Sequence, residues 1–303
     1  YMGEFNLKQR AKMLMSLRRN SAKIAEKFAD KDERAIAKER RRLNGKIIGG
    51  NFLFVEHFEL IITTKCSLNC NGCSNLMPEY RRRKEAYFRD KTEIMHEIDM
   101  LLDAVDSVLN CRILGGEPML HPDLAEILAY LLKKENVGSI HIITNGTVVP
   151  KGELMGALKN KRVIVIFSDD GKRSRNIEEC CNILQKEKVN YNVNSSLKWS
   201  DLGDMKKREV SVEELTMQRK NCKFCCKTYL NGRFHLCPRS AFGTDLGYFD
   251  YPDDYLQLEN MSLSERRKEI AEMLYSKPYI ECCAHCLAGT EMAKPIDAGE
   301  QIE

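Results

Sequence analysis

The sequence predicts an α/β protein built around a parallel sheet. Short apolar runs alternate with longer segments whose apolar residues recur at helical spacing, from about residue 57 to about residue 195. Repeated strand–helix units are typical of parallel sheets, because each helix carries the chain back to the start of the next strand. From about residue 215 cysteines become dense and helical periodicity stops until residues 262–275, which predicts a second, smaller domain.

The predicted elements follow one another in a regular order. Strands are predicted at residues 58–63, 111–114, 139–144, 162–167 and 190–195, and helices at residues 91–107, 122–134, 152–158 and 174–187. Residues 207–212 predict a weak sixth strand. We divide the chain into residues 1–52, a basic helical extension, residues 53–213, the α/β domain, and residues 214–303, the cysteine-rich domain.

Composition and charge limit the class of protein. The 303 residues carry 48 Lys and Arg against 44 Asp and Glu, but residues 1–46 alone hold 14 basic and 6 acidic residues. We interpret this segment as an amphipathic helical extension, with binding to nucleic acid or another anionic surface as the alternative. No apolar run has the length of a membrane span or a signal peptide, so a cytoplasmic protein is expected. In a reducing compartment, 13 cysteines favour metal binding over disulfides.

Three cysteines follow the first predicted strand at the spacing C-x3-C-x2-C: Cys66, Cys70 and Cys73. Their thiolates can hold three irons of a [4Fe–4S] cluster and leave the fourth iron without a protein ligand, which favours catalysis on a bound small molecule. Zinc is the alternative, although it usually takes four N or S ligands, often in CxxC pairs. A loop after a parallel strand is also where α/β barrels build active sites.

At these cysteines the sequence resembles the radical S-adenosylmethionine (radical SAM) superfamily. The resemblance implies a partial (β/α)6 barrel, in which S-adenosylmethionine (SAM) binds the open iron and is cleaved reductively to a 5′-deoxyadenosyl radical that abstracts hydrogen from a substrate. The family usually has an aromatic residue directly before the third cysteine, near the adenine ring, but here that position is Gly72. We therefore expect the adenine contact to come from elsewhere, with Leu76 or Met77 as candidates.

A glycine pair ends the second predicted strand, in the run Gly115-Gly116-Glu117-Pro118. Two glycines let the backbone approach a ligand closely. The resemblance implies that this motif contacts the amino group of SAM, with Glu117 as an acceptor, and a simple strand-to-helix turn is the alternative. Asn145 and Ser168 end the next two strands, where members of the family often contact the ribose or carboxylate of SAM. Turn formation is the alternative for both.

A second cysteine group lies in the C-terminal part of the chain. Cys222, Gly232 and Cys237 have the spacing C-x9-G-x4-C, and Cys283-Ala-His-Cys286 follows. This spacing resembles the twitch domain, the short form of the SPASM domain. The resemblance implies an auxiliary [4Fe–4S] cluster held by Cys222, Cys237, Cys283 and Cys286. Residues 229–236 predict a hairpin with an Asn-Gly turn that brings flanking cysteines together. Zinc also suits four thiolates and is the alternative metal.

Three further cysteines leave the ligand assignment of the second group open. Cys225, Cys226 and Cys282 lie beside the chosen ligands. Each is an alternative ligand, or a thiol outside the cluster that can donate a hydrogen atom to a substrate. After the first cysteine group comes the basic run Arg81-Arg82-Arg83-Lys84. We interpret this run as a solvated face, with a clamp for a phosphate or carboxylate as the alternative.

The motifs and the resemblance lead to three hypotheses for function. The first is a radical SAM oxidoreductase that oxidises or epimerises a carbohydrate-like or other polar small molecule. The second is a maturase that modifies a ribosomally made peptide, and the third is a non-catalytic metal- or nucleic-acid-binding protein. As partners we expect a small-molecule or peptide substrate and a reductant such as flavodoxin or ferredoxin. Neither a membrane nor nucleic acid is favoured.

Overall fold

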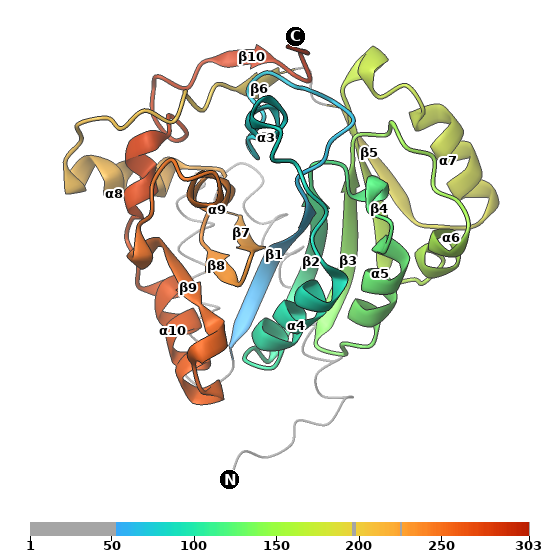
Figure 1. The fold of residues 1–303 in the computed structure, drawn as a ribbon, viewed down its shortest axis with the longest axis horizontal. Helices are drawn as coiled ribbons and strands as arrows, with labels where there is room; N and C mark the ends of the chain where they lie inside the picture. The colour runs from blue at the N-terminus through green and yellow to red at the C-terminus, as the bar shows by residue number, and fades with distance from the viewer. Residues whose placement is uncertain (1–52, 196–197, 225, 303) are drawn as a thin grey trace, which may run out of the picture.

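A mixed eight-stranded sheet forms the centre of the protein (Figure 1). The structure is a computed structural model and describes residues 53–302 except 196, 197 and 225. The basic extension predicted for residues 1–52 therefore lies outside the described residues, as does Cys225. The strands of this sheet are β1 (Phe54–Thr63), β2 (Ser107–Gly115), β3 (Val137–Thr144), β4 (Val163–Asp169), β5 (Tyr191–Ser195), β7 (Lys227–Leu230), β8 (Arg233–His235) and β9 (Tyr255–Gln257).

The strand order explains why the fold class is α/β. The order is β5-β4-β3-β2-β1-β7-β8-β9. All neighbouring pairs from β5 to β7 are parallel, whereas β8 pairs antiparallel with both β7 and β9. Each of the five predicted strands is present and carries the chain into a helix or an irregular connection on the way to the next one. The prediction of an α/β partial barrel is confirmed.

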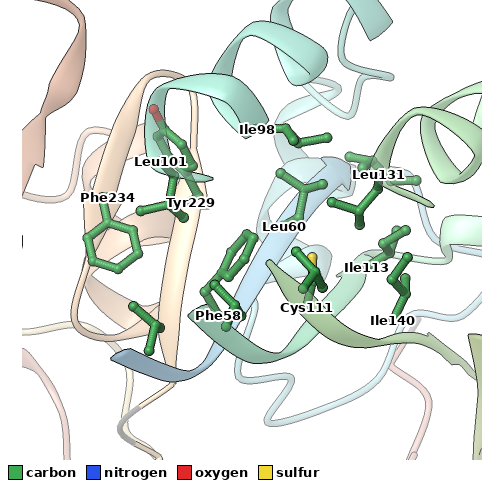
Figure 2. Packing of buried hydrophobic residues seen from close by; sticks show 14 of the residues in the cluster. Phe58, Leu60, Ile98, Leu101, Cys111, Ile113, Leu131, Ile140, Tyr229 and Phe234 are labelled. Carbon is green, nitrogen blue, oxygen red and sulfur yellow. The ribbon is translucent and has the colours of Figure 1, made fainter. Parts of the chain in front are cut away.

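Alternation along the strands decides which face packs against the helices. Phe58 and Leu60 of β1 are fully buried on one face, and Glu59 between them points to the other. The helices that follow the first strands are α4 (Lys91–Leu102), α5 (Leu124–Leu132), α6 (Glu153–Leu158) and α7 (Ile177–Lys186). Figure 2 shows Phe58 and Leu60 packed with side chains of neighbouring strands and of α4 and α5: Ile113, Ile140, Ile98, Leu101 and Leu131. This core fixes the strand ends that carry the predicted site.

The predicted sixth strand at residues 207–212 is wrong. Residues 206–211 form no strand, and α8 (Val212–Asn221) begins at the end of the predicted segment. The physical reason is local: Ser211 and Glu214 form a reciprocal capping box that starts a helix, and the preceding residues are mostly charged. The free side of β1 is instead taken by β7, which pairs with it in parallel.

The hairpin predicted at residues 229–236 is present. β7 and β8 are joined by Asn231 and Gly232, which both have positive φ, as a two-residue hairpin turn requires. Because β7 also pairs with β1, the main sheet continues across residue 214. The division of the chain into two domains at that residue stays a prediction.

Several further elements complete the fold. The remaining helices are α3 (Met77–Arg83), α9 (Pro238–Asp245) and α10 (Leu263–Tyr275), and a second, two-stranded sheet pairs β6 (Lys198–Ser200) with β10 (Pro295–Asp297). Sequence periodicity predicts α10 but misses α8 and α9. Figure 1 shows β6, β10 and α3 together at the end of the sheet where β1 to β4 end. Among the described helices, none has the length and apolar character to cross a membrane.

Candidate functional site

The three cysteines of the first group lie in the loop after β1 and line one cavity of about 470 Å³. Burial raises the pKa of the Cys66 thiol to about 12 and that of the Cys70 thiol to about 11. The charges of Cys70 and Cys73 add to the rise at Cys66, so the three thiols are close enough to repel one another as thiolates. Three neighbouring thiolates need a positive centre between them. They are the donor set that an iron–sulfur cluster requires.

A glycine in a tight turn shapes this loop. Gly72 has φ +67°, and a Cβ there would lie 2.2 Å from Ile296 Cδ1 of β10. Of the two residues expected near the adenine ring, Met77 lines the cavity and Leu76 does not, although both are buried in the same apolar cluster. Whether either of them contacts adenine stays a prediction.

The basic run after the loop has partners within the protein. Arg81 Nη2 donates to Cys66 O at 2.7 Å, Arg82 pairs with Glu79, and Arg83 Nη1 donates to Leu246 O at 2.6 Å. None of the four residues of the run is among those that line the cavity. Arg81 therefore holds the cysteine loop from outside the cavity.

Residues 299–302 cover the cysteine loop. Gln301 Nε2 donates to Cys70 Sγ at 3.1 Å, and the backbone N–H of Asn69 donates to Gln301 Oε1 at 2.7 Å. Next to it, Asn71 N donates to Glu300 O at 2.6 Å. These bonds pair the loop with residues 299–302, which belong to none of the sequence motifs. A distant part of the chain therefore supplies the polar group next to Cys70.

The glycine pair lies where the cysteine loop crosses the end of β2. A Cβ on Gly116 would lie 2.1 Å from Lys65 O, and one on Gly115 would lie 2.0 Å from Thr63 O. Both glycines line the cavity, and Pro118 begins a short 3₁₀ turn behind them. The two glycines thus allow the cysteine loop to pack closely against the end of β2, while their predicted approach to a ligand stays a prediction.

Glu117 is fully buried and lies behind the cavity wall. Its Oε1 accepts from Met119 N at 3.0 Å and from Thr144 Oγ1 at 2.8 Å, and its Oε2 accepts from Asn145 N at 2.8 Å. Burial raises the pKa of Glu117 to about 7, against the opposing effect of these donors. In this arrangement the carboxylate joins the ends of β2 and β3. Its predicted contact with the amino group of SAM stays a prediction.

Replacing Glu117 with Gln is expected to lower the free energy of unfolding by about 1–3 kcal/mol, because an amide turns one N–H towards a backbone or hydroxyl donor. Urea unfolding at neutral pH measures the change. Glu126→Gln is the matched control, since that side chain is 55% exposed and pairs only with Lys91 at the surface. Equal stability of the Glu117 variant and the parent would contradict the bonds described for Glu117.

Asn145 and Ser168 come together with the cysteines at the same cavity. Asn145 Nδ2 donates to Ser67 Oγ at 3.1 Å and lies 3.6 Å from Cys66 Sγ. Ser168 lies on β4, and its carbonyl accepts from Ser174 Oγ at 3.1 Å. The structure therefore brings both predicted residues to the site, while their contacts with SAM stay a prediction.

The second cysteine group is also gathered in space. Cys282 hydrogen-bonds with Cys237 and Cys283 and lowers the pKa of both. Burial raises the pKa of Cys286 to about 11, with contributions from the charges of Cys237 and Cys283, and Cys222 packs on the small apolar cluster that contains Cys286. Cys282 thus lies among the four predicted ligands, and the choice of ligands stays open.

A polar clamp that the sequence does not indicate holds this group in place. Gln218 Nε2 donates to the carbonyl oxygens of Cys283 and Cys286, at 3.1 and 2.7 Å. Arg208 Nη2 donates to the same two oxygens at 3.0 and 2.9 Å. In the described part of the chain no three His, Cys, Asp or Glu side chains are arranged to hold a single metal ion. Ligands of a four-iron cluster bind separate irons and need not converge on one ion.

The polar floor of the cavity is a feature that the sequence analysis misses. Glu59 of β1 lines the cavity with Cys226, and Thr228 Oγ1 donates to Glu59 Oε2 at 3.1 Å. Arg112 Nη1 donates to Cys226 Sγ at 3.7 Å. Burial raises the pKa of Glu59, partly offset by hydrogen bonds and by the charge of Arg112. The sequence signal that could have indicated this polar floor is Glu59 itself, an acidic residue inside the apolar run of residues 58–63.

Comparison with known proteins gives one family and partial relatives. The family described as the radical SAM superfamily matches residues 60–168. A probable GTP 3′,8-cyclase of Methanococcus maripaludis is 34% identical over 97 residues, which is 32% of this chain and 31% of that protein. The antilisterial bacteriocin subtilosin biosynthesis protein AlbA of Bacillus subtilis is 34% identical over 116 residues, 37% of this chain and 24% of AlbA. The chain thus matches about a quarter to a third of the length of these relatives.

Among solved structures, that of tagged anSMEcpe with bound AdoMet is similar at 13% identity. The similarity covers 81% of this chain and 89% of that chain, with a TM-score of 0.43. The matched residues 60–168 of the family contain the cysteine loop, the glycine pair, Asn145 and Ser168. The family implies a [4Fe–4S] cluster and SAM as cofactors, and the three neighbouring thiols after β1, which line one cavity, fit such a cluster. This match identifies residues 60–168 as a radical SAM domain.

Proposed function

We propose that the protein is an enzyme that uses SAM to remove a hydrogen atom from a C–H bond of a polar substrate. The observation that supports this most is the convergence on one cavity: the cysteine triad, the glycine pair, Asn145 and Ser168 all line it. The wall around the cysteines and the floor beneath them come from neighbouring parallel strands. A site of this kind at the carboxyl ends of strands is where α/β barrels bind and convert substrates.

The chain's own residues would hold and tune the cofactors. When bound, the cluster and SAM supply the radical chemistry of the reaction. Cys66, Cys70 and Cys73 would bind three irons, and Gln301 and Asn145 direct N–H groups at two of these sulfurs. Hydrogen bonds to cluster sulfurs raise the reduction potential. Gly115 and Gly116 line the cavity beside the loop, where their backbone would face the bound ligand.

The floor of the cavity supports a polar substrate. Glu59 lines the cavity with its carboxyl group, which suits hydroxyl or amino groups of a carbohydrate-like small molecule. We infer oxidation or epimerisation of such a molecule as the reaction. In an oxidation, Glu59 is the candidate that accepts the proton, because its raised pKa makes the ionised form a stronger base. The remaining electron needs an acceptor, for which the second cysteine group, as a twitch-like auxiliary cluster, is the candidate.

Modification of a ribosomally made peptide is the second candidate function. It is favoured by the similarity to AlbA, a bacteriocin biosynthesis protein, over 116 residues. The basic segment of residues 1–46 would then bind an acidic leader peptide. Loss of peptide binding on deletion of that segment, with SAM binding intact, would favour this candidate over a small-molecule substrate.

The proposed function is tested by reductive cleavage of SAM. The anaerobically reconstituted protein with a chemical reductant or flavodoxin is expected to release 5′-deoxyadenosine and methionine. Product analysis with polyols and aminocyclitols in deuterated water then separates the reactions: a keto product without solvent deuterium indicates oxidation, and an inverted product with deuterium indicates epimerisation. Absence of SAM cleavage, together with salt-sensitive binding of nucleic acid, would instead support the non-catalytic hypothesis.

A further inference from the structure

One aromatic side chain of the cavity wall comes from outside the matched family region. Among the described residues that line the cavity, only Trp199 and Phe224 are aromatic. Trp199 lies on β6 and is the only tryptophan of the chain. It is partly exposed and lines the cavity.

The ribbon of β6 and β10 brings Trp199 to the cysteine loop. Trp199 is paired in register with Ile296 of β10. Ile296 Cδ1 occupies the space beside Gly72, 2.2 Å from the position that a Cβ on Gly72 would take. The missing side chain at residue 72 therefore lets the ribbon pack into the loop. As a consequence, the indole belongs to the same wall as Cys70, Gly72 and Cys73.

Phe224 belongs to the other side of the site. It packs on the apolar cluster of Leu202, Cys286 and Ala288, beside the second cysteine group. Its backbone N–H also faces Cys222 Sγ at 3.3 Å. The two aromatic residues thus line different parts of the cavity. Phe224 lies beside the second cysteine group, and Trp199 lies beside the first cysteine loop, through its strand partner Ile296.

We infer that Trp199 is the aromatic surface against which the adenine ring of SAM stacks. This inference rests on the proposed function, because it takes SAM as the ligand of the cavity. A purine stacks on an indole with a favourable free energy that does not depend on specific hydrogen bonds. Polar groups near the ring, such as Ser168 and Ser200, line the same wall and are available to the ribose.

The test measures SAM binding rather than turnover. Equilibrium dialysis with labelled SAM, on anaerobically reconstituted protein, gives the Kd of the parent and of Trp199→Ala, Trp199→Phe, Phe224→Leu and Ile296→Ala. We expect Trp199→Ala to weaken binding about tenfold or more at unchanged iron content. Trp199→Phe should recover most of the affinity, and Phe224→Leu, on the other side of the cavity, should lose less affinity than Trp199→Ala. In the parent, the emission of the single tryptophan should change with the same Kd.

Three outcomes are distinguishable. A loss in Trp199→Ala that exceeds the loss in Ile296→Ala, with recovery in Trp199→Phe, supports stacking on the indole. Equal losses in Trp199→Ala and Ile296→Ala without recovery by Phe, or a Trp199→Ala variant that binds SAM like the parent, would overturn the inference and leave the proposed function in place. No saturable binding of SAM to the reconstituted parent would overturn the proposed function and this inference with it.

Discussion

The Cys66→Ala/Cys70→Ala/Cys73→Ala variant is expected to lose about four of about eight irons per chain after anaerobic reconstitution. The reason is that these three side chains are the only cysteines in the loop after β1 and line the cavity together. The variant should also release no 5′-deoxyadenosine from SAM. Iron and sulfide analysis beside the cleavage assay measures both effects.

A cysteine outside both groups provides the control for this prediction. Cys181→Ala removes a partly buried thiol of α7 and should keep the iron content and the SAM cleavage of the parent. About four irons in the parent and none in the triple variant would mean that the second cysteine group binds zinc or nothing. The role of that group as an electron acceptor would then have to be abandoned.

Glu97→Ala is expected to lower the free energy of unfolding by about 3–5 kcal/mol, because it leaves the buried charge of Arg89 without its carboxylate partner. The side chains of Arg89 and Glu97 are 1% and 6% exposed, and Arg89 Nη2 lies 2.5 Å from Glu97 Oε1. The same oxygen accepts from Gly232 N, in the turn between β7 and β8. Urea unfolding measures this loss of stability. Both α4 and the β7–β8 hairpin should be destabilised, because Glu97 joins them.

Two variants separate the charge from other effects of the Glu97 substitution. Glu93→Ala, on the exposed side of the same helix, should change the free energy of unfolding by less than about 1 kcal/mol. Arg89→Met combined with Glu97→Met removes both charges and should recover part of the loss. A Glu97→Ala variant with the stability of Glu93→Ala would show that the pair contributes nothing to folding.

Most of the parallel sheet could be predicted because its strands carry their own pattern. Short apolar runs identify the strands β1 to β5 even when the strands that pair with them are not known. The position of β7 beside β1 could not be predicted, because residues 227–230 are a short run whose register depends on a strand about 170 residues earlier. The strand at residues 207–212 was wrongly predicted because Val210 and Val212 favour a strand by their type. The capping box of Ser211 and Glu214, which starts α8, was not taken into account.

The candidate site could be predicted as far as it lies at strand ends. Cys66, the glycine pair, Asn145 and Ser168 all follow or end parallel strands, and the carboxyl ends of such strands meet at one edge. Trp199 and Gln301 were missed because they reach the site through pairing between segments far apart in sequence. The burial of the Glu117 carboxylate behind the cavity wall could not be predicted either. It depends on hydrogen bonds from Thr144 and Asn145, at the end of the neighbouring strand β3.

The cover formed by residues 299–302 has a consequence for how the cofactor enters the protein. Gln301 and Cys70, which it contacts, are 231 residues apart in the sequence. A ribosome completes the cysteine loop long before it adds the covering segment, so an iron–sulfur carrier has access to the thiols while the chain is still being made. In the folded chain, the hydrogen bonds of Gln301 cover the loop on the side of Cys70, so a carrier reaches this side more easily when the segment detaches. Such an opening breaks only a few hydrogen bonds near the surface, so it costs far less than global unfolding.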